Sequence, residues 1–363
     1  MDVIGIIVEY NPFHNGHLYH LNEIKRRYPN SLIIAILPGY FMQRGELSVI
    51  SKEEKVKIAL DNNIDIVLEL PSLYATQSAD VYAYNAVKIL NEFKINRLIF
   101  GSETNNCETL RQIAEKNIKE EDIKKYLKMG LNYPTALKKA LNIDFSYNNP
   151  NDLLAISYIK AIINNNYDIK YETIKRTSNY HDKQSNAKVI SASNIRNKIM
   201  NNIDIKKFVP INYKNFNKGD NLFTILKYKI ITSHNLDDYL DVSEGLDNLL
   251  KKEITKSNDL EDLIKRLKSK RYTYNRLKRM LIHILLGIRK IDSTSDTYIR
   301  ILGFNKSGQK YIKECKKSFT LPIYNKDLDS ITKTYEKKAS FVYDLINNTN
   351  TFKFEIENKP IIK

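Results

Sequence analysis

Hydrophobic residues in the first hundred positions fall in four short, continuous runs separated by longer segments of mixed polarity. The runs are rich in Ile, Val and Leu, as in strands buried on both faces, and span residues 3–8, 32–37, 65–70 and 97–100. The segments between them have helical periodicity, at roughly residues 17–27, 51–62 and 78–93. Strands and helices that alternate at this spacing predict an α/β fold with a Rossmann-like parallel sheet.

The pattern becomes mainly helical after the fourth run. Between residues 107 and 165 the helical pattern is interrupted near Pro150, and a strand-like stretch, Ile169–Ile174, comes next. A polar loop, Ser178–Lys188, precedes a further helix for which Ser193 is the expected N-cap.

Beyond residue 200 the sequence has no strand alternation of comparable quality. Helical periodicity dominates residues 221–317, and Thr351–Lys363 is expected to be a short extended tail. By the rough rule of ~150 residues per domain, we expect two domains. The first covers residues 1–200 and is α/β, and the second covers residues 201–363 and is mainly α-helical.

Charge is distributed unevenly between the two parts of the chain. Residues 1–190 hold 24 Lys and Arg against 22 Asp and Glu, whereas residues 191–363 hold 34 against 20. An AT-rich genome would enrich lysine everywhere, so it does not explain why the first half is nearly neutral. The asymmetry favours a polyanion partner for the second half, nucleic acid before membrane.

The densest basic stretch is residues 265–279, which contains no Asp or Glu. A solvated helix face is the ordinary interpretation of such a run, but intrahelical ion pairs cannot neutralise this one. Lysine and arginine beside tyrosine suit RNA phosphates and unstacked bases, so we expect RNA rather than DNA here. The candidate RNA-binding residues are Lys268, Lys270, Arg271, Tyr272, Arg276, Lys278 and Arg279.

Composition excludes several classes of protein. With 42% hydrophobic residues the chain can bury a sizeable core, which excludes wholesale disorder. No apolar run reaches 18 residues, and the N-terminus lacks the features of a signal peptide, so we expect no membrane span. Cys107 and Cys315 have no CxxC partner, which favours a reducing cytoplasm over a disulfide scaffold or structural zinc.

Candidate chemistry lies where the predicted strands end, because ligands of open parallel sheets bind beyond the carboxyl ends of the strands. These exits are Glu9–His17, Pro38–Glu46, Glu69–Ser78 and Gly101–Glu103. Glu69 ends a buried strand, and a buried carboxylate needs a partner. A histidine, Mg²⁺ or a neighbouring helix N-terminus would each serve.

The first exit carries the sequence His14-Asn15-Gly16-His17. Glycine there lets the backbone approach a phosphate, and the free N–H groups of the new helix favour an anion. Two imidazoles can hydrogen-bond phosphate oxygens and stabilise a departing pyrophosphate. His20 adds a third imidazole, but no acidic or cysteine ligand is spaced to complete a metal site, so we expect none.

These motifs resemble a known family. The HNGH sequence, together with Ile190–Arg196, is similar to the two signatures of the HIGH-type nucleotidylyltransferase superfamily. The longer stretches Gly5–His20 and Pro38–Glu46 resemble the bacterial tRNA(Met) cytidine acetate ligase family. Ala192 and Asn194 depart from the superfamily pattern, which leaves Ser193 and Arg196 as the candidate phosphate contacts of the second signature.

The resemblance implies a two-step reaction. ATP and acetate would give acetyl-adenylate and pyrophosphate, with Mg²⁺ expected alongside ATP. The acetyl group would then pass to N4 of the wobble cytidine of elongator tRNA(Met), with the basic second domain binding the tRNA. His14, His17 and Arg44 are the expected catalytic residues, although a surface salt bridge would also explain Arg44.

The ATP-binding residues that the resemblance implies combine one continuous stretch with five later positions. They are Ile7, Val8, Glu9, Tyr10, Asn11, Pro12, Phe13, His14, Asn15, Gly16, His17, Leu18, Tyr19, His20, Gly101, Asn151, Arg176, Ser193 and Arg196. Two other functions remain open from the residues alone: an adenylyltransferase for a small phosphorylated metabolite, and a non-catalytic RNA-binding protein on the same fold.

Overall fold

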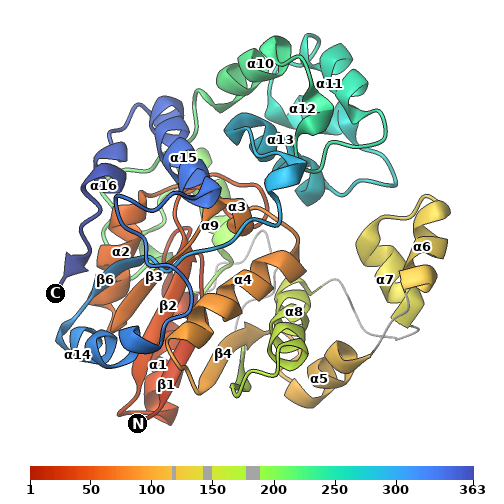
Figure 1. The fold of residues 1–363 in the computed structure, drawn as a ribbon. Coiled ribbons are helices and arrows are strands. Elements are labelled where there is room, and N and C mark those ends of the chain that lie inside the picture. Colours follow the sequence, from red (N-terminus) through yellow and green to blue (C-terminus); the bar gives the residue numbers. More distant parts are fainter. Residues whose placement is uncertain (117–119, 142–148, 177–188) are drawn as a thin grey trace.

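A computed structural model describes residues 1–116, 120–141, 149–176 and 189–363, so the predicted loop Ser178–Lys188 lies outside the described residues. Its centre is a seven-stranded sheet with the strand order β5-β4-β1-β2-β3-β6-β7. Figure 1 shows helices α4 and α8 in front of this sheet and the helices α10–α13 grouped above it. Among the described residues, no helix is both long and apolar enough to cross a membrane.

The first half of the chain builds the parallel part of the sheet. Its elements are β1 (Val3–Ile7), α1 (Asn15–Arg27), β2 (Leu32–Pro38), α2 (Lys52–Asp61), β3 (Ile66–Leu70), α3 (Ser72–Ala75), α4 (Ala79–Glu92), β4 (Arg97–Ser102), α5 (Cys107–Glu115), α6 (Glu120–Lys128), α7 (Tyr133–Leu141), α8 (Pro150–Asn164) and β5 (Lys170–Lys175). All neighbouring pairs among these five strands are parallel. The predicted α/β fold with a Rossmann-like parallel sheet is therefore confirmed.

The second half is mainly helical, as predicted. It contains α9 (Ala192–Met200), α10 (Leu222–Thr232), α11 (Leu246–Ile254), α12 (Leu260–Leu267), α13 (Tyr274–Leu286), β6 (Ile301–Phe304), α14 (Lys306–Cys315), α15 (Ile331–Asn347), α16 (Phe352–Glu357) and β7 (Ile361–Ile362). Short 3₁₀ turns lie at Lys206–Phe208, Leu236–Asp238, Lys290–Asp292 and Lys316–Ser318.

Two strands that the sequence pattern did not predict extend the sheet. Strand β6 pairs antiparallel with β3, and β7 pairs parallel with β6, so the chain returns to the sheet after the helices α10–α13. The expectation of an extended tail at Thr351–Lys363 is wrong, because α16 forms within it. Strands of four and two residues are too short to give a periodic signal of their own.

Side chains of β2 show how the sheet divides the core. Ile34 and Ile36 pack with residues of α4 and α8 on one face, whereas Ile33 and Ala35 pack with residues of α1, α2 and α9 on the other. This alternation follows from the period of two in a strand, and both faces are covered. The continuous apolar runs of the sequence are thereby explained.

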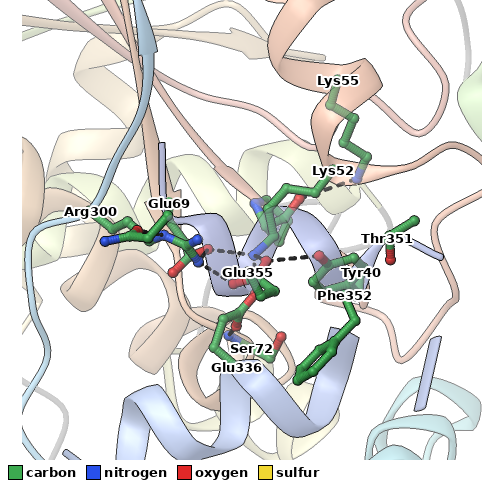
Figure 2. Close-up of polar contacts among 12 residues, drawn as sticks. Tyr40, Lys52, Lys55, Glu69, Ser72, Arg300, Glu336, Thr351, Phe352 and Glu355 are labelled. Atoms are coloured by element: carbon green, nitrogen blue, oxygen red, sulfur yellow. Dashed lines mark hydrogen bonds and ion pairs between the residues drawn. The ribbon is translucent and has the colours of Figure 1, made fainter. Parts of the chain in front are cut away.

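A buried cluster of charged side chains joins the sheet to the C-terminal helices (Figure 2). The Lys52 Nζ lies 2.5 Å from Glu69 Oε1, 2.7 Å from Glu336 Oε1 and 2.5 Å from Glu355 Oε1. Arg300 Nη1 pairs with Glu69 at 3.0 Å and also with Glu355. Burial alone would lower the pKa of Lys52, but attraction to Glu336, Glu355 and Glu69 raises it well above its usual range.

The cluster also supplies the partners that the buried carboxylate of Glu69 requires. Its carboxylate binds Lys52, Arg300 and the Tyr298 hydroxyl, and neither histidine nor a helix N-terminus is among these partners. The start of α3 is bound instead by Glu336, whose Oε2 accepts from the Ser72 N–H at 2.6 Å. The three carboxylates lie close enough to hold a metal ion, and the Lys52 ammonium binds all three of them.

We predict that Lys52→Met destabilises the fold strongly. Removing one partner of a buried ion pair leaves uncompensated charge, which costs about 3–5 kcal/mol. Urea unfolding should show a correspondingly lower free energy of unfolding. Lys57→Met, which breaks an exposed pair with Glu53, is the matched control and should cost less than about 1 kcal/mol. Equal losses in the two variants would contradict the role given to Lys52.

Candidate active site

A pocket opens at the carboxyl ends of the parallel strands. It is lined by most of the residues that the sequence singled out: Ile7, Val8, Glu9, Tyr10, Asn11, His14, Gly16, His17, Tyr19, His20, Arg44, Gly101, Asn151, Arg176, Ser193 and Arg196. The structure thus brings the first, second and fourth predicted strand exits together with the start of α9. The third exit, at Glu69, belongs to the buried charged cluster instead.

Four residues of the predicted continuous stretch lie outside the pocket wall. Phe13 is fully buried and packs edge-on against Tyr10, with 4.8 Å between the ring centroids. Pro12 is buried, Leu18 packs on the core, and the Asn15 Nδ2 donates to the carbonyl of Lys207 at 3.0 Å. A helix turns successive side chains to different faces, so a continuous stretch cannot all face one ligand.

His14 and His17 cap the first helix of the fold. The His14 Nδ1 accepts from the Gly16 N–H at 3.0 Å, and the His17 Nδ1 accepts from the His14 N–H at 3.3 Å. The two rings are stacked with centroids 3.9 Å apart. A Cβ on Gly16 would lie 2.8 Å from the His14 Cε1, so glycine is needed for the imidazole to pass close to the backbone.

This capping fixes the protonation of both rings. Because each Nδ1 accepts a hydrogen bond, a neutral ring carries its proton on Nε2, which is then free to donate. Burial, with Arg176 and Arg196 nearby, lowers the pKa of His14 to about 3. Burial and the neighbouring His14 lower the pKa of His17 well below its usual value. Both imidazoles are therefore neutral donors at pH 7.

His20 and Arg176 present enclosed nitrogens without a hydrogen-bond partner among the described residues. The His20 Nε2 and the Arg176 Nε are both buried and make no hydrogen bond within the part of the chain that the structure describes, and both residues line the pocket. The Arg176 Nε lies 3.9 Å from the Glu103 Oε1, its nearest ion-pairing atom. Burial lowers the pKa of Arg176, partly opposed by Glu103. The buried Arg176 Nε is a donor, and leaving it without an acceptor is costly, so this part of the pocket favours an anionic ligand.

Glu103 is a site residue to which the sequence analysis gave no role. One of its oxygens accepts from the Asn151 Nδ2 at 2.5 Å, and the other accepts from the Asp152 N–H at the start of α8 at 3.0 Å. Glu103 therefore orients Asn151 and lies beside Arg176. A Cβ on Gly101 would meet the Arg176 Cγ at 3.4 Å, which is ordinary contact, so this glycine leaves room without being strained.

The second signature is placed differently from the prediction. Ser191 is the N-cap of α9, and its Oγ accepts from the Asn194 N–H at 3.3 Å, so the assignment of the cap to Ser193 is wrong. Ser193 lies in the pocket wall instead, with its Oγ 3.0 Å from that of Ser191. Arg196 donates from Nη1 to the Asn11 carbonyl at 2.8 Å and pairs through Nη2 with Glu46.

Further pocket residues were given no role from the sequence, although Gln43 lies in the second strand exit and Ser191 and Ala192 lie in the second signature. Gln43 adjoins Arg44, and its N–H donates to the Glu9 Oε1 at 2.8 Å. Tyr82 and Tyr158 reach the pocket from α4 and α8. The other lining residues that were not predicted are Phe100, Leu154, Ile174, Lys175, Ser191 and Ala192. Helix packing brings the two tyrosines to the site, which a motif search along the chain cannot detect.

The candidate RNA-binding residues lie in α13 and the loop before it. Lys270 and Arg271 are exposed, whereas Tyr272 is buried at 6% exposure, so its ring is not presented for base stacking. Its hydroxyl donates to Glu244 at 3.0 Å, and the Arg276 guanidinium lies 4.8 Å from the ring centroid.

Acidic residues from a neighbouring segment partly neutralise the basic stretch. Glu244 pairs with Arg271, and Asp241 lies 3.8 Å from the Arg276 Nε. Lys278 and Arg279 are half-buried on α13, and the Lys268 ammonium lies 5.7 Å from the Tyr274 ring centroid. These acidic partners lie outside residues 265–279, so the composition of that stretch alone does not reveal them.

We predict that the free energy of unfolding falls as pH drops from about 6.5 toward 4. Burial, with Arg176 and Arg27 nearby, lowers the pKa of His20 from 6.5 to about 4, so in this window the unfolded chain binds a proton that the folded chain excludes. Each such imidazole contributes a loss of about 1.4 kcal/mol per pH unit.

Urea unfolding at several pH values should therefore show that the free energy of unfolding falls less steeply with decreasing pH in His20→Gln than in the wild type. His234→Gln removes an exposed imidazole and is the matched control. An acid slope in His20→Gln equal to that of the wild type would contradict the prediction.

Comparisons with known proteins match the chain along its whole length. A model of the HIGH Nucleotidyl Transferase family matches residues 1–358. The tRNA(Met) cytidine acetate ligase of Clostridium perfringens is 37% identical, with 100% of each chain covered.

Solved structures agree with these relatives. The crystal structure of apo Thermotoga maritima TmcAL matches with a TM-score of 0.89 at 27% identity, covering 100% of this chain and 99% of that one. The same protein bound with alpha-thio ATP matches with a TM-score of 0.84 at 28% identity and the same coverage. The chain described here thus belongs to the tRNA(Met) cytidine acetate ligase family of HIGH nucleotidyl transferases.

Proposed function

We propose that this protein is an ATP-dependent acetate ligase that acetylates N4 of the wobble cytidine of elongator tRNA(Met). The observation that carries the proposal is the cluster of His14, His17, His20 and Arg176, whose enclosed donors face a pocket at the carboxyl ends of the strands. A triphosphate would supply acceptors for the Nε2–H groups of His14 and His17 and for the buried Arg176 Nε. The relative from Thermotoga maritima was solved with alpha-thio ATP, which supports the same ligand here.

In the first step the acetate carboxylate attacks the α-phosphorus of ATP and pyrophosphate leaves. The neutral Nε2–H groups of His14 and His17 donate to phosphate oxygens, and Arg176 neutralises charge that develops on the departing pyrophosphate. The two imidazoles are held by the helix cap before ATP arrives, so they need little reorganisation, and Glu103 lies 3.9 Å from the Arg176 Nε. Arg44 lines the same pocket, and we assign it the role of binding the acetate carboxylate.

Mg²⁺ is proposed to enter with ATP. Among the described residues that line the pocket, Glu9 is the one carboxylate, and its Oε1 already accepts from the Gln43 N–H. Mg²⁺ in nucleotide sites keeps several waters and is held mainly by phosphates with one or two carboxylates. The remaining oxygen of Glu9 fits that role, and the metal would neutralise triphosphate charge.

In the second step the exocyclic amine of cytidine attacks the acetyl carbonyl and AMP leaves. This amine is weakly basic, so positioning against the adenylate is the main requirement. Residues 1–200 are proposed to form the catalytic domain, and the basic surface of residues 201–363 is proposed to bind the tRNA. We assign the protein to the cytoplasm, where Cys107 and Cys315 stay reduced.

We predict that ATP–pyrophosphate exchange requires acetate. Exchange should appear with acetate and be lost when it is omitted, because reversal of the first step needs the acetyl-adenylate. Transfer of labelled acetate to a tRNA(Met) transcript then tests the second step. ATP binding without exchange on any carboxylate would contradict acetate activation and favour an adenylyltransferase for another acceptor. Failure to bind ATP would favour an RNA-binding protein without catalysis.

We also predict that His17→Ala lowers acetate-dependent exchange by about a hundredfold or more, since removal of one preorganised donor costs about that much. The fold should persist, because His17 lies at the start of α1 and its loss removes one hydrogen bond of the cap. His234→Ala, at an exposed position, is the matched control. Full exchange activity in His17→Ala with an unchanged melting profile would refute the assignment.

A further inference from the structure

The turn Tyr40–Ser48 lies between the pocket and the basic helix α13. It is held by hydrogen bonds from the Met42 N–H to the Glu46 carbonyl at 2.8 Å and from the Gly45 N–H to the Met42 carbonyl at 2.9 Å. On one side of the turn Gln43 and Arg44 line the pocket. The same short segment therefore faces the proposed catalytic centre on one side and faces helix α13 at its tip.

Gly45 brings α13 into direct contact with this turn. Its φ is +71°, and a Cβ there would lie 2.5 Å from the backbone N of Arg279 and from the backbone C of Lys278. A side chain at this position would be strained and would push the helix away. Because the backbone of the turn lies directly against the backbone of α13, a displacement of the helix displaces the turn as well.

Glu46, the next residue, is shared between two cations. Its Oε2 pairs with the Nη2 of Arg196 in the pocket wall, and its Oε1 lies 3.8 Å from the Nζ of Lys278 on α13. All three side chains are largely shielded, with exposures of 26% for Glu46, 14% for Arg196 and 27% for Lys278. Shielding from water strengthens both ion pairs relative to pairs on an open surface.

We propose that Glu46 is a positioning residue that links the ATP pocket to the RNA-binding helix. This inference rests on the proposed function, with Arg196 as the predicted phosphate contact of the pocket and Lys278 as a predicted RNA-binding residue. An anion that engages one cation competes with Glu46 for it. The carboxylate then pairs more fully with the other cation, which binds its own anion less tightly.

The linkage between the two binding sites is negative. Bound triphosphate weakens the binding of RNA, and bound RNA weakens the binding of triphosphate. By thermodynamic reciprocity the affinity changes by the same factor in both directions. Departure of pyrophosphate returns Glu46 to Arg196 and leaves Lys278 available to RNA. The pocket thus favours tight RNA binding after the adenylate has formed, which orders the two steps of the reaction.

The test is the Kd of a tRNA(Met) transcript, with and without saturating α,β-methylene ATP, at one fixed salt concentration because binding to phosphates depends on salt. For the wild type we expect the nucleotide to raise this Kd by about fivefold. In Glu46→Gln the ratio should fall below about twofold, and RNA alone should bind more tightly than to the wild type, since Lys278 has lost its competitor.

Two further variants separate linkage from damage to the fold. Lys278→Gln should also remove the linkage, but it should weaken RNA binding, opposite in direction to Glu46→Gln. Glu53→Gln breaks an exposed pair with Lys57 and should retain the wild-type Kd and ratio. A wild-type ratio of one, or an unchanged ratio in Glu46→Gln, would overturn the inference while leaving the proposed function intact. Absence of RNA binding by the wild type would overturn both.

Discussion

The arrangement of the pocket depends on the ion pairs made by the buried ammonium of Lys52. This ammonium joins α2 to three carboxylates from β3, α15 and α16, so helices from the end of the chain are fixed to the centre of the sheet. Tyr40, where the turn to the pocket begins, donates to Glu355 at 2.8 Å within the same cluster. The side of the turn that carries Arg44 is therefore anchored by residues some 300 positions away in sequence.

The pocket follows the opposite electrostatic rule from the cluster. In the cluster each buried cation has carboxylates beside it, whereas in the pocket imidazoles and arginines are enclosed with few acids. Burial keeps His14 and His17 neutral, and their Nδ1 atoms are already used by the helix cap. A site of this kind is preorganised for an anion, because the cap fixes its imidazoles and Glu9 is the one carboxylate among its described lining residues.

Sequence patterns predicted the parts of the structure that depend on local signals. The parallel strands are continuous apolar runs, and the histidines follow the first strand directly, so both were found. Strand β6 and helix α16 were missed because their short segments are stabilised by distant partners, β3 and the Lys52 cluster. The burial of Tyr272 was missed for a similar reason, since its partner Glu244 lies outside the basic stretch. Ser193 was taken for the cap because Ser191 and Ser193, two positions apart, offer equivalent local signals.

The wide separation of the partners in the charged cluster affects how the protein is made. Lys52 and Glu69 are 17 positions apart and leave the ribosome together, whereas Glu336 and Glu355 follow 284 and 303 positions after Lys52. Domains generally fold as units, and a unit is complete only when all of its segments have been synthesised. The charged cluster can therefore close only after the last helices have been synthesised, and until then the Lys52 ammonium has Glu69 alone of its three carboxylate partners.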